Sequence, residues 1–355
     1  MAVPHPVSPP RRPGHRTIRT IRTNTIALRI NTRVLRLTGL ALVALAFLMV
    51  WAVTLGDYPM SVGDVVRAIA GRGSEESEMV VRTLRLPRIL AAVLTGAALA
   101  ISGTIFQGIA RNPLVSPDII GINAGASLVA ISTIILGGMS VLVPVGAFIG
   151  ALLTAALIYA LSWQNGIAMN RLILVGIGVG AVVGAATTYM TVKFPIEITR
   201  PAIVWSMGSF YAVEWKDVVL LAIAVGVLLP LAIVLMESLR VLQYGDVVSR
   251  SLGLPLERTR LLLIVVGCAL AAVCVALAGP IGFIALVVPH MARMLAGPPA
   301  GSVLAFTAVL GAIVLLVSDM VAQHALPVTL PVGVITGAVG APYFLYLLYR
   351  SNARS

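Results

Sequence analysis

Long apolar runs limit this chain to very few possible folds. We identify ten runs, most of them near the roughly 20 residues that a helix needs to cross a bilayer. They cover residues 37–56, 88–109, 117–137, 141–163, 171–192, 218–236, 261–279, 281–296, 302–321 and 331–349. Hydrophobic residues make up 59% of the chain and charged residues only 11%, which is typical of a polytopic membrane protein and not of a soluble domain. The sequence therefore predicts an all-α integral membrane protein with ten transmembrane helices.

Glycine and proline divide the longest apolar stretch. Residues 261–296 are too long for one crossing, and Gly279-Pro280 interrupts them because proline cannot continue the helical hydrogen-bond ladder. The run that follows is short and contains Pro289, so we expect a tilted or partly re-entrant helix there. Segment 193–217 is not expected to cross, and it predicts a short helix near the membrane surface.

The residues ahead of the first run are strongly basic. They include no acid and carry Arg11, Arg12, Arg16, Arg19, Arg22, Arg29, Arg33 and Arg36. Such a tail can bind nucleic acid or anionic lipid, but we interpret residues 1–36 as a disordered cytoplasmic tail that sets the topology, with no nucleic-acid partner. Ten crossings then place both termini in the cytoplasm, where most of the Lys and Arg residues also fall. Residues 37–350 are predicted to form one transmembrane domain.

No pattern for catalysis, a cofactor or a metal ion is found in the sequence. The only two lysines, Lys193 and Lys216, do not follow glycine, so there is no phosphate-binding loop. No group of His, Cys and carboxylate residues has metal-ligand spacing. Gly176, Gly180 and Gly184 recur at four-residue spacing in an apolar run, which favours helix packing or pore lining. We therefore predict that this chain is not an enzyme and holds no cofactor or metal.

Ionisable residues are almost absent from the middle of the runs. Asp118 and Asp319 fall near run ends, and His290 lies in the short eighth run. A proton- or sodium-coupled carrier needs buried acids, so an ion-coupled secondary carrier is the less favoured alternative. A second alternative is a membrane scaffold or receptor that transports nothing. The sequence indicates a passage whose energy comes from a partner.

Four long motifs resemble the FecCD family, the permease subunits of type II ABC importers for ferric siderophores, haem and cobalamin. They read LRLPRILAAVLTGAALAISGTIFQGIARNPLVSPDIIGINAGASL, SLGLPLERTR, LAGPIGFIALVVPHMARM and LPVGVITGAVGAPYFLYLL, and the resemblance covers residues 37–349. It implies the ten-helix type II ABC importer permease fold. It also implies a dimer with a second copy or a paralogue, two ATP-binding subunits on the cytoplasmic face, and an extracytoplasmic substrate-binding protein.

A polar turn joins the second and third runs. Its prolines remove helical hydrogen-bond donors, Asn112 can bond the freed backbone groups, and Leu114 can act as an apolar plug that excludes water. From the residues alone, an ordinary tight loop is the favoured interpretation. The resemblance implies that Asn112 and Leu114 belong to the cytoplasmic gate, with a second constriction at Met169 and Asn170.

The longest cytoplasmic loop, 237–260, predicts short helices on either side of a turn. Gly and Pro punctuate helices, so the turn falls at Leu252, Gly253, Leu254 and Pro255. The resemblance implies that residues 242–260 fit a cleft on the ATP-binding subunit. The positive charges that could pair with acids there are Arg250, Arg258 and Arg260, whereas a solvated basic loop is the alternative.

Two arginines flank Pro87 at the start of the second run, and the predicted topology places them outside, against the usual charge bias. Snorkelling to lipid headgroups is one explanation for Arg85 and Arg88. The resemblance implies instead that they pair with glutamates of the binding protein, where bidentate geometry would fix the orientation. The family's third docking arginine is replaced by Gln323, beside His324, which could substitute when protonated.

A bulky metal chelate needs a wide channel that binds it weakly. We predict lining by the fifth and tenth runs and the external segment, including Gly176, Gly180, Gly184, Trp205, Met207 and Phe210. The function predicted is the permease subunit of an ATP-driven importer in the cell membrane. Ferric siderophores are the expected substrates, with haem or cobalamin as alternatives, and ATP hydrolysis is expected on another chain.

Overall fold

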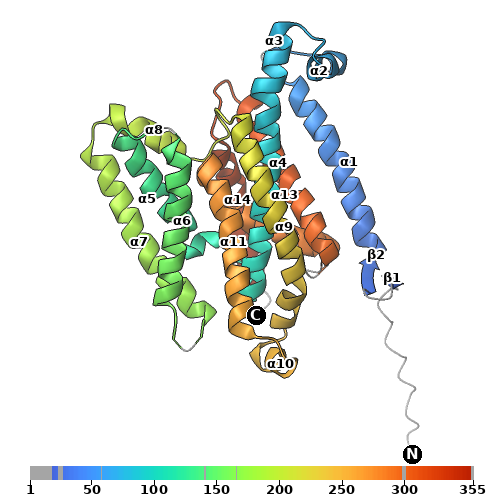
Figure 1. Ribbon diagram of the computed structural model, residues 1–355, viewed down its shortest axis with the longest axis vertical. Helices are drawn as coiled ribbons and strands as arrows, with labels where there is room; N and C mark the ends of the chain where they lie inside the picture. Colours follow the sequence, from blue (N-terminus) through green and yellow to red (C-terminus); the bar gives the residue numbers. More distant parts are fainter. Residues whose placement is uncertain are drawn as a thin grey trace, which may run out of the picture.

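A computed structural model describes residues 18–22, 27–56, 58–139, 141–164, 166–297 and 301–352. The described residues form a bundle of helices, with one small hairpin near the N-terminus (Figure 1). Each of the ten predicted runs holds one of the long helices. These are α1 (Thr32–Thr54), α4 (Leu86–Ala110), α5 (Ile122–Ile135), α6 (Leu142–Leu161), α7 (Met169–Lys193), α9 (Trp215–Leu242), α11 (Leu256–Ala278), α12 (Ile284–Ala296), α13 (Gly301–His324) and α14 (Val332–Asn352).

Eight helices in the described part of the chain are long and apolar enough to cross a membrane, and α5 and α12 are shorter. At 14 and 13 residues, these two span about 20 Å, less than the ~30 Å hydrocarbon core. The shortness of α12 agrees with the prediction. The third run is not one continuous helix as predicted, because Pro117 starts a separate 3-10 turn, η2 (Pro117–Ile120), and Gly121 adopts a left-handed conformation with φ 69° before α5.

The N-terminal segment differs from the disorder predicted for it. Strands β1 (Ile18–Arg22) and β2 (Ala27–Asn31) pair antiparallel, with Ile18 opposite Asn31. Isoleucine and threonine, which are β-branched, favour strands, and β1 contains three of them. Helix α1 then begins at Thr32, ahead of the predicted start at residue 37. The remainder of the predicted tail, residues 1–17 and 23–26, lies outside the described residues.

Short elements mark the two ends of the bundle. One end carries α2 (Val62–Ile69), α3 (Glu75–Glu78) and the π-helix η1 (Met79–Arg85), which leads directly into α4, together with α8 (Ile196–Ser206) (Figure 1). The opposite end carries α10 (Asp246–Ser251). We call these the α8 end and the α10 end. Helix α8 confirms the short helix predicted in segment 193–217, and the break at Gly279-Pro280 is confirmed between α11 and α12.

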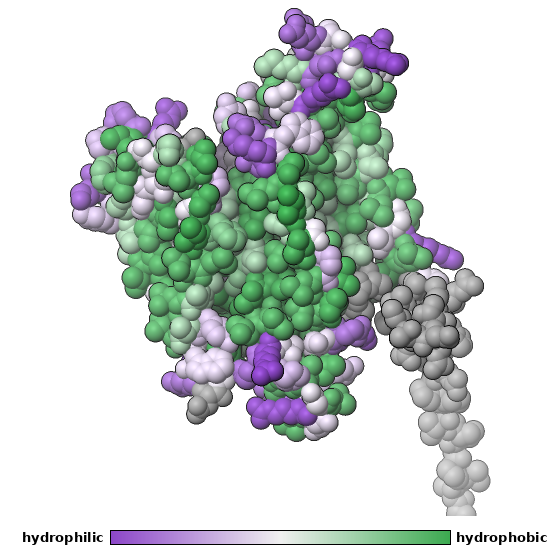
Figure 2. All heavy atoms as spheres, viewed as in Figure 1, coloured by the Kyte–Doolittle hydropathy of each residue, from purple (hydrophilic) through white to green (hydrophobic). Residues whose placement is uncertain are grey.

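The surface between the two ends is apolar. Figure 2 shows a broad hydrophobic belt on the visible face, with hydrophilic residues gathered at both ends. Residues of the belt include Leu40, Val43 and Phe47 on α1 and Val182 on α7, all of them exposed. A soluble monomer rarely exposes an apolar patch of this size. The belt is therefore the surface that contacts lipid or another membrane subunit.

Helix α4 is the centre of the bundle and the most buried of the spans. It packs against α13, α11, α9 and α12, and glycine permits the closest of these contacts. A Cβ added to Gly96 would overlap the carbonyl oxygen of Gly311, and one added to Gly103 would overlap that of Ala285. Helix α4 is thus packed closely among four neighbours, and its end carries the polar turn singled out in the sequence.

Candidate gate and coupling site

The polar turn begins where α4 ends. Arg111 takes a left-handed conformation, with φ 52°, and the backbone N–H of Asn112 donates to the carbonyl of Gln107 at 3.2 Å. The Asn112 side-chain oxygen accepts a hydrogen bond from the backbone N–H of Leu114 at 2.9 Å. This bond confirms that Asn112 satisfies a backbone group freed by the turn. Asn112 is exposed and Leu114 is half-buried, and they follow Arg111, whose contact with Asp246 of α10 places the turn at the α10 end.

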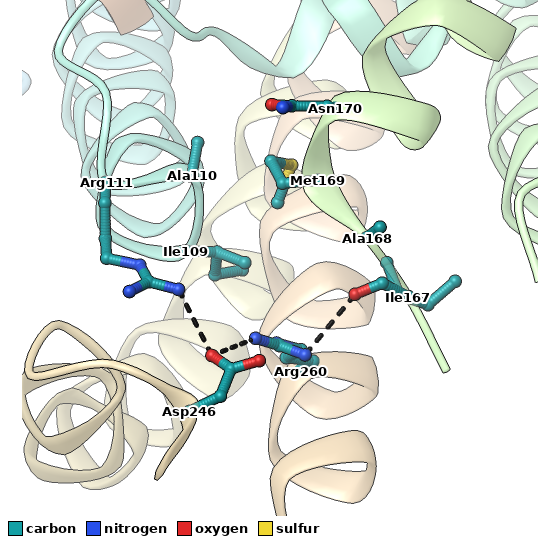
Figure 3. A pocket seen from close by; sticks show the side chains of 9 residues that line it. All are labelled: Ile109, Ala110, Arg111, Ile167, Ala168, Met169, Asn170, Asp246 and Arg260. Atoms are coloured by element: carbon teal, nitrogen blue, oxygen red, sulfur yellow. Dashed lines mark hydrogen bonds and ion pairs between the residues drawn. The ribbon is translucent and has the colours of Figure 1, made fainter. Parts of the chain in front are cut away.

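A pocket of about 390 Å³ lies beside this turn (Figure 3). It brings together the end of α4, the segment before α7, the first residues of α7, and one residue each from α10 and α11. The lining residues are Ile109, Ala110, Arg111, Ile167, Ala168, Met169, Asn170, Asp246 and Arg260. The predicted second constriction, Met169 and Asn170, therefore faces the end of α4. Asn112 and Leu114 are outside the lining, one turn further along the chain.

Asp246 joins the two sides of the pocket by ion pairs. Its Oδ1 atom accepts from Nη2 of Arg260 at 2.7 Å and from Nη2 of Arg111 at 3.1 Å (Figure 3). Nη1 of Arg260 also donates to the carbonyl of Ile167 at 3.3 Å. One carboxylate thus links α10 to the end of α4, and through Arg260 to the segment that leads into α7.

Charge keeps Asp246 ionised. The hydrogen bond from Arg260 lowers the pKa of the Asp246 carboxyl below its ordinary value, whereas partial burial raises it. The positive charges of Arg260, Arg111 and Arg250 lower the pKa further. Glu257 completes the cluster, because one of its oxygens accepts from the backbone N–H of Ile167 at 3.2 Å and the other lies 3.5 Å from Arg260. Two carboxylates and two guanidinium groups therefore hold the three segments together.

The predicted coupling segment forms a short helix and a turn. Helix α10 is followed by Gly253, whose φ is 80°, and the backbone N–H of Leu254 donates to the carbonyl of Ser249 at 3.0 Å. Arg250, Leu252, Gly253, Pro255 and Arg258 are exposed, and Leu254 is half-buried. The guanidinium of Arg260 is bonded to Asp246 and Ile167 of its own chain, and its pairing with an acid of a partner stays a prediction.

Apolar side chains project from this segment. Tyr244, Val247 and Leu252 are all exposed; Val247 belongs to α10, and the other two flank this helix in the sequence. An exposed apolar cluster with a polar rim marks a protein–protein contact. We name Tyr244, Val247 and Leu252 the α10 knob.

At the α8 end, Arg85 is engaged by the backbone of its own chain. Its two Nη atoms donate to the carbonyls of Val53 at 2.7 Å and Tyr58 at 2.8 Å. Val53 lies in the last turn of α1, where carbonyl groups have no partner within the helix. The side chain therefore caps α1 and holds it against the beginning of α4. Docking by Arg85 stays a prediction.

Arg88 is paired inside the bundle. Its Nε and Nη2 atoms donate to the two oxygens of Asp319 on α13, at 2.9 and 2.8 Å, in a bidentate arrangement. Asp319 is 1% exposed and the Arg88 side chain 15%. Gln323 donates to the same carboxylate at 2.7 Å, while His324 is exposed at the end of α13. Sequence reasoning noticed Asp319 but missed this pair. One signal was available, because Asp319 and Arg88 both lie near run ends on the same side of the membrane.

The predicted pathway residues separate into two groups. Gly180 and Gly184 on α7 face open space, Met207 is exposed, and Trp205 is half-buried. Phe210 is buried in the core and offers no surface to a pathway in this structure. Gly176 is also a packing residue, since an added Cβ would overlap the carbonyl oxygen of Ile119.

Within the described residues, no group of three or more His, Cys, Asp or Glu side chains could hold a metal ion.

Comparison with known proteins gives consistent matches over most of the chain. A profile of the FecCD transport family matches residues 44–350. The Fe(3+)-citrate import system permease protein YfmE of Bacillus subtilis (strain 168) is 40% identical over 86% of this chain and 92% of its own length. The ferric enterobactin transport system permease protein FepG of Escherichia coli (strain K12) is 38% identical, over 86% and 93%.

Two further matches bear on substrate and fold. The cobalamin import system permease protein BtuC of Halobacterium salinarum is 39% identical over 79% of this chain and 76% of its own length. A solved structure described as an inward-facing conformation of a metal-chelate type ABC transporter superposes with a TM-score of 0.82. It is 28% identical and covers 89% of this chain and 99% of that one.

Proposed function

We propose, from the premise that this chain belongs to the FecCD transport family, that it is the permease subunit of an ATP-driven importer and forms the path for ferric siderophore complexes. The observation that carries the proposal is the family match over residues 44–350, on a multi-pass bundle with an apolar belt. Relatives named for ferric citrate and ferric enterobactin favour an iron chelate. Import of cobalamin or haem is the second candidate, because a cobalamin permease is 39% identical.

The chain is a multi-pass protein of the cell membrane, and we propose that its α10 end is cytoplasmic, with both termini on that side. The excess of Lys and Arg in the segments of that end supports this orientation. Two ATP-binding subunits would then contact the α10 knob, where apolar side chains are already exposed. A substrate-binding protein would dock at the α8 end, and a second permease, either a copy or a paralogue, would complete the pathway.

We place the gate around the pocket. Asn112 and Leu114 follow Arg111 on one side, and Met169 and Asn170 lie on the other. The pocket lets these two segments approach or separate without unfolding either helix. A hydrophobic constriction such as Leu114 can close a pathway by excluding water. The gate and the contact with the ATP-binding subunit are therefore neighbours at one end of the bundle.

Transport by the purified complex tests this function. Proteoliposomes containing this chain with its permease, ATP-binding and substrate-binding partners should accumulate a labelled ferric siderophore when ATP is present. A panel of ferric catecholate, ferric hydroxamate, ferric citrate, haem and cobalamin would identify the substrate. Uptake that persists with an ATP-binding subunit unable to hydrolyse ATP would refute the ABC mechanism and favour a secondary carrier.

The turn after α10 supplies a second test. Replacing Gly253 with valine should uncouple ATP hydrolysis from uptake, because a β-branched residue at φ 80° costs on the order of 1–2 kcal/mol and would reshape the turn. No atom lies within 4 Å of an added Cβ, so the effect would come from the backbone and not from a clash. The ratio of ATP hydrolysed to chelate imported should rise.

Gly253→Asn is the matched control, since asparagine tolerates the left-handed region and should keep most of the coupling. Co-purification of the ATP-binding subunit checks that each variant assembles. If Gly253→Val assembled and imported the chelate with an unchanged ratio, the coupling role of this turn would be wrong.

A further inference from the structure

Asp246 occupies an unusual position in the α10 segment. It is the first residue of α10, which presents Val247 and Leu252 outward, yet the Asp246 carboxylate points back into the pocket (Figure 3). There it contacts Arg111, which ends α4 and lies 135 positions away in the sequence, and Arg260 near the start of α11. The same short helix therefore has one face available to a partner and the other bonded to the gate segments.

We propose that Asp246 is a positioning residue that transmits movement of α10 to both sides of the gate, by holding Arg111 and Arg260 at the same time. The proposal rests on the function proposed above and assigns this residue a part in it. In this role Asp246, which lines the pocket, acts through Arg111 and Arg260 and not on the transported chelate.

The path to the first side of the gate is short. Arg111 has a left-handed backbone, so it is the residue at which the rigid α4 stops and the turn begins. Leu114 follows it three positions later, and its backbone N–H donates to the side-chain oxygen of Asn112. Because glycine contacts hold α4 tightly, a pull on the Arg111 side chain is more easily absorbed by the turn than by the helix.

The path to the second side passes through Arg260. Its other guanidinium nitrogen donates to the carbonyl of Ile167, and Glu257 accepts from the N–H of the same residue. Both polar groups of the Ile167 peptide backbone are thus bonded to the start of α11. Met169 and Asn170 follow directly, so a shift of Asp246 reaches them through Arg260 and Ile167.

The exposure of these charges suits a contact that opens and closes. The Arg111 and Asp246 side chains are 45% and 40% exposed, and ion pairs in contact with water add little to folding stability. Little free energy is therefore needed to separate Arg111 from Asp246. When the carboxylate leaves, or loses its charge, Arg111 and Arg260 face each other across the pocket and repel, which favours separation of the two gate segments.

The experiment uses the complete reconstituted complex. We compare wild type with Asp246→Asn, Asp246→Glu, Arg111→Gln and the Asp246→Asn/Arg111→Gln double variant. Each is also made with Leu114→Cys as a reporter, which a membrane-impermeant thiol reagent modifies from the α10 side. The native Cys268 and Cys274 are buried and are expected to react slowly.

For Asp246→Asn we expect about a fivefold rise in the ATP hydrolysed per chelate imported, because the exposed pair with Arg111 and the less exposed pair with Arg260 both lose their charge attraction. Labelling at position 114 should be faster than in wild type and should no longer depend on nucleotide. Arg111→Gln should also raise the ATP hydrolysed per chelate. The double variant should show no higher ratio than Asp246→Asn, because both substitutions remove the same Arg111–Asp246 contact. Asp246→Glu should restore part of the coupling.

Glu237→Gln is the matched control. Glu237 pairs with Arg240 within α9 at the same end of the bundle, at 2.8 Å, so this variant removes a carboxylate charge that joins no two segments. It should behave as wild type. Co-purification of all subunits shows whether each variant assembles.

Three results would overturn the inference or its premise, and they are distinguishable. If wild type shows no ATP-dependent uptake, the proposed function fails. If wild type imports the chelate but Asp246→Asn keeps the wild-type ratio and nucleotide-dependent labelling, the role of Asp246 is refuted. If Asp246→Asn instead loses the ATP-binding subunit while labelling at position 114 is unchanged, Asp246 belongs to the subunit interface and not to the gate.

Discussion

Replacing Arg88 with alanine is expected to remove most of the folded protein from the membrane. The substitution would leave the Asp319 carboxylate, which is 1% exposed, with only Gln323 as a partner. Breaking a buried ion pair by removing one side costs about 3–5 kcal/mol, which is a large share of the stability of a typical domain. The yield of monodisperse protein in detergent and its melting temperature measure the loss.

Replacing both partners should largely restore the fold. Arg88→Met combined with Asp319→Leu removes both charges, and apolar side chains of similar volume often substitute for a buried ion pair at little cost. Arg67→Ala is the control, since Arg67 pairs with Asp64 on the exposed surface of α2 and such pairs contribute only ~0–1 kcal/mol. An Arg88→Ala variant as stable as wild type would contradict an interior role.

The apolar double variant also tests docking. If it folds and the substrate-binding protein still stimulates ATP hydrolysis with unchanged affinity, Arg88 does not contact that protein. If stimulation is lost while basal hydrolysis remains, the docking prediction holds for Arg88 in addition to its pairing with Asp319. Replacing both Arg85 and Arg88 with glutamate could not separate these outcomes, because a glutamate at position 88 would place a second carboxylate next to buried Asp319.

Adding one methyl group at Gly103 is the second change with a large expected effect. A Cβ at Gly103 would overlap the carbonyl oxygen of Ala285, a backbone atom that cannot rotate away. Helices α4 and α12 would have to separate, and overpacking costs typically about 1–3 kcal/mol even where side chains can adjust. We expect Gly103→Ala to lower the melting temperature and the yield strongly.

The separation would reach the gate end of α4. One turn beyond Gly103, Gln107 donates to the carbonyl of Leu286 at 3.0 Å and accepts from Arg293, so both bonds to α12 should weaken together. Gly226→Ala is the identical change at a position in α9 where nothing lies within 4 Å, and it should be neutral. Equal stability of the two variants would show that the α4–α12 contact is looser than the structure has it.

Much of the helical framework could be predicted because its signals are local. The length of an apolar run sets a helix, and Gly279-Pro280 ends one whatever the rest of the chain does. The short helices α8 and α10 also followed from their own segments. The third run was the exception, because Pro117 and Gly121 redirect the chain after Ser116 and shorten α5 to 14 residues.

The candidate site depended on contacts that no local pattern contains. Sequence reasoning singled out Arg88, Arg260 and Asn112 as candidate site residues, but it did not identify the partners that the arginines have within the chain. Arg88 pairs with an acid 231 positions away, and Arg111 with one 135 positions away. Arg260 pairs with Asp246, which is only 14 positions away but lies across the turn after α10, and sequence reasoning did not consider Asp246.

The sequence by itself determined that this chain is a bundle of apolar helices in a membrane, and it fixed the positions of most breaks, turns and charged ends. Only the tertiary structure decided which charges are neutralised within the chain and which remain for partners. The physical reason is the range of the forces. The hydropathy of a run and the backbone geometry of Gly and Pro depend on residues that are neighbours in the sequence, whereas an ion pair needs an N–O distance of a few ångströms between segments. Close glycine packing around α4 sets that distance.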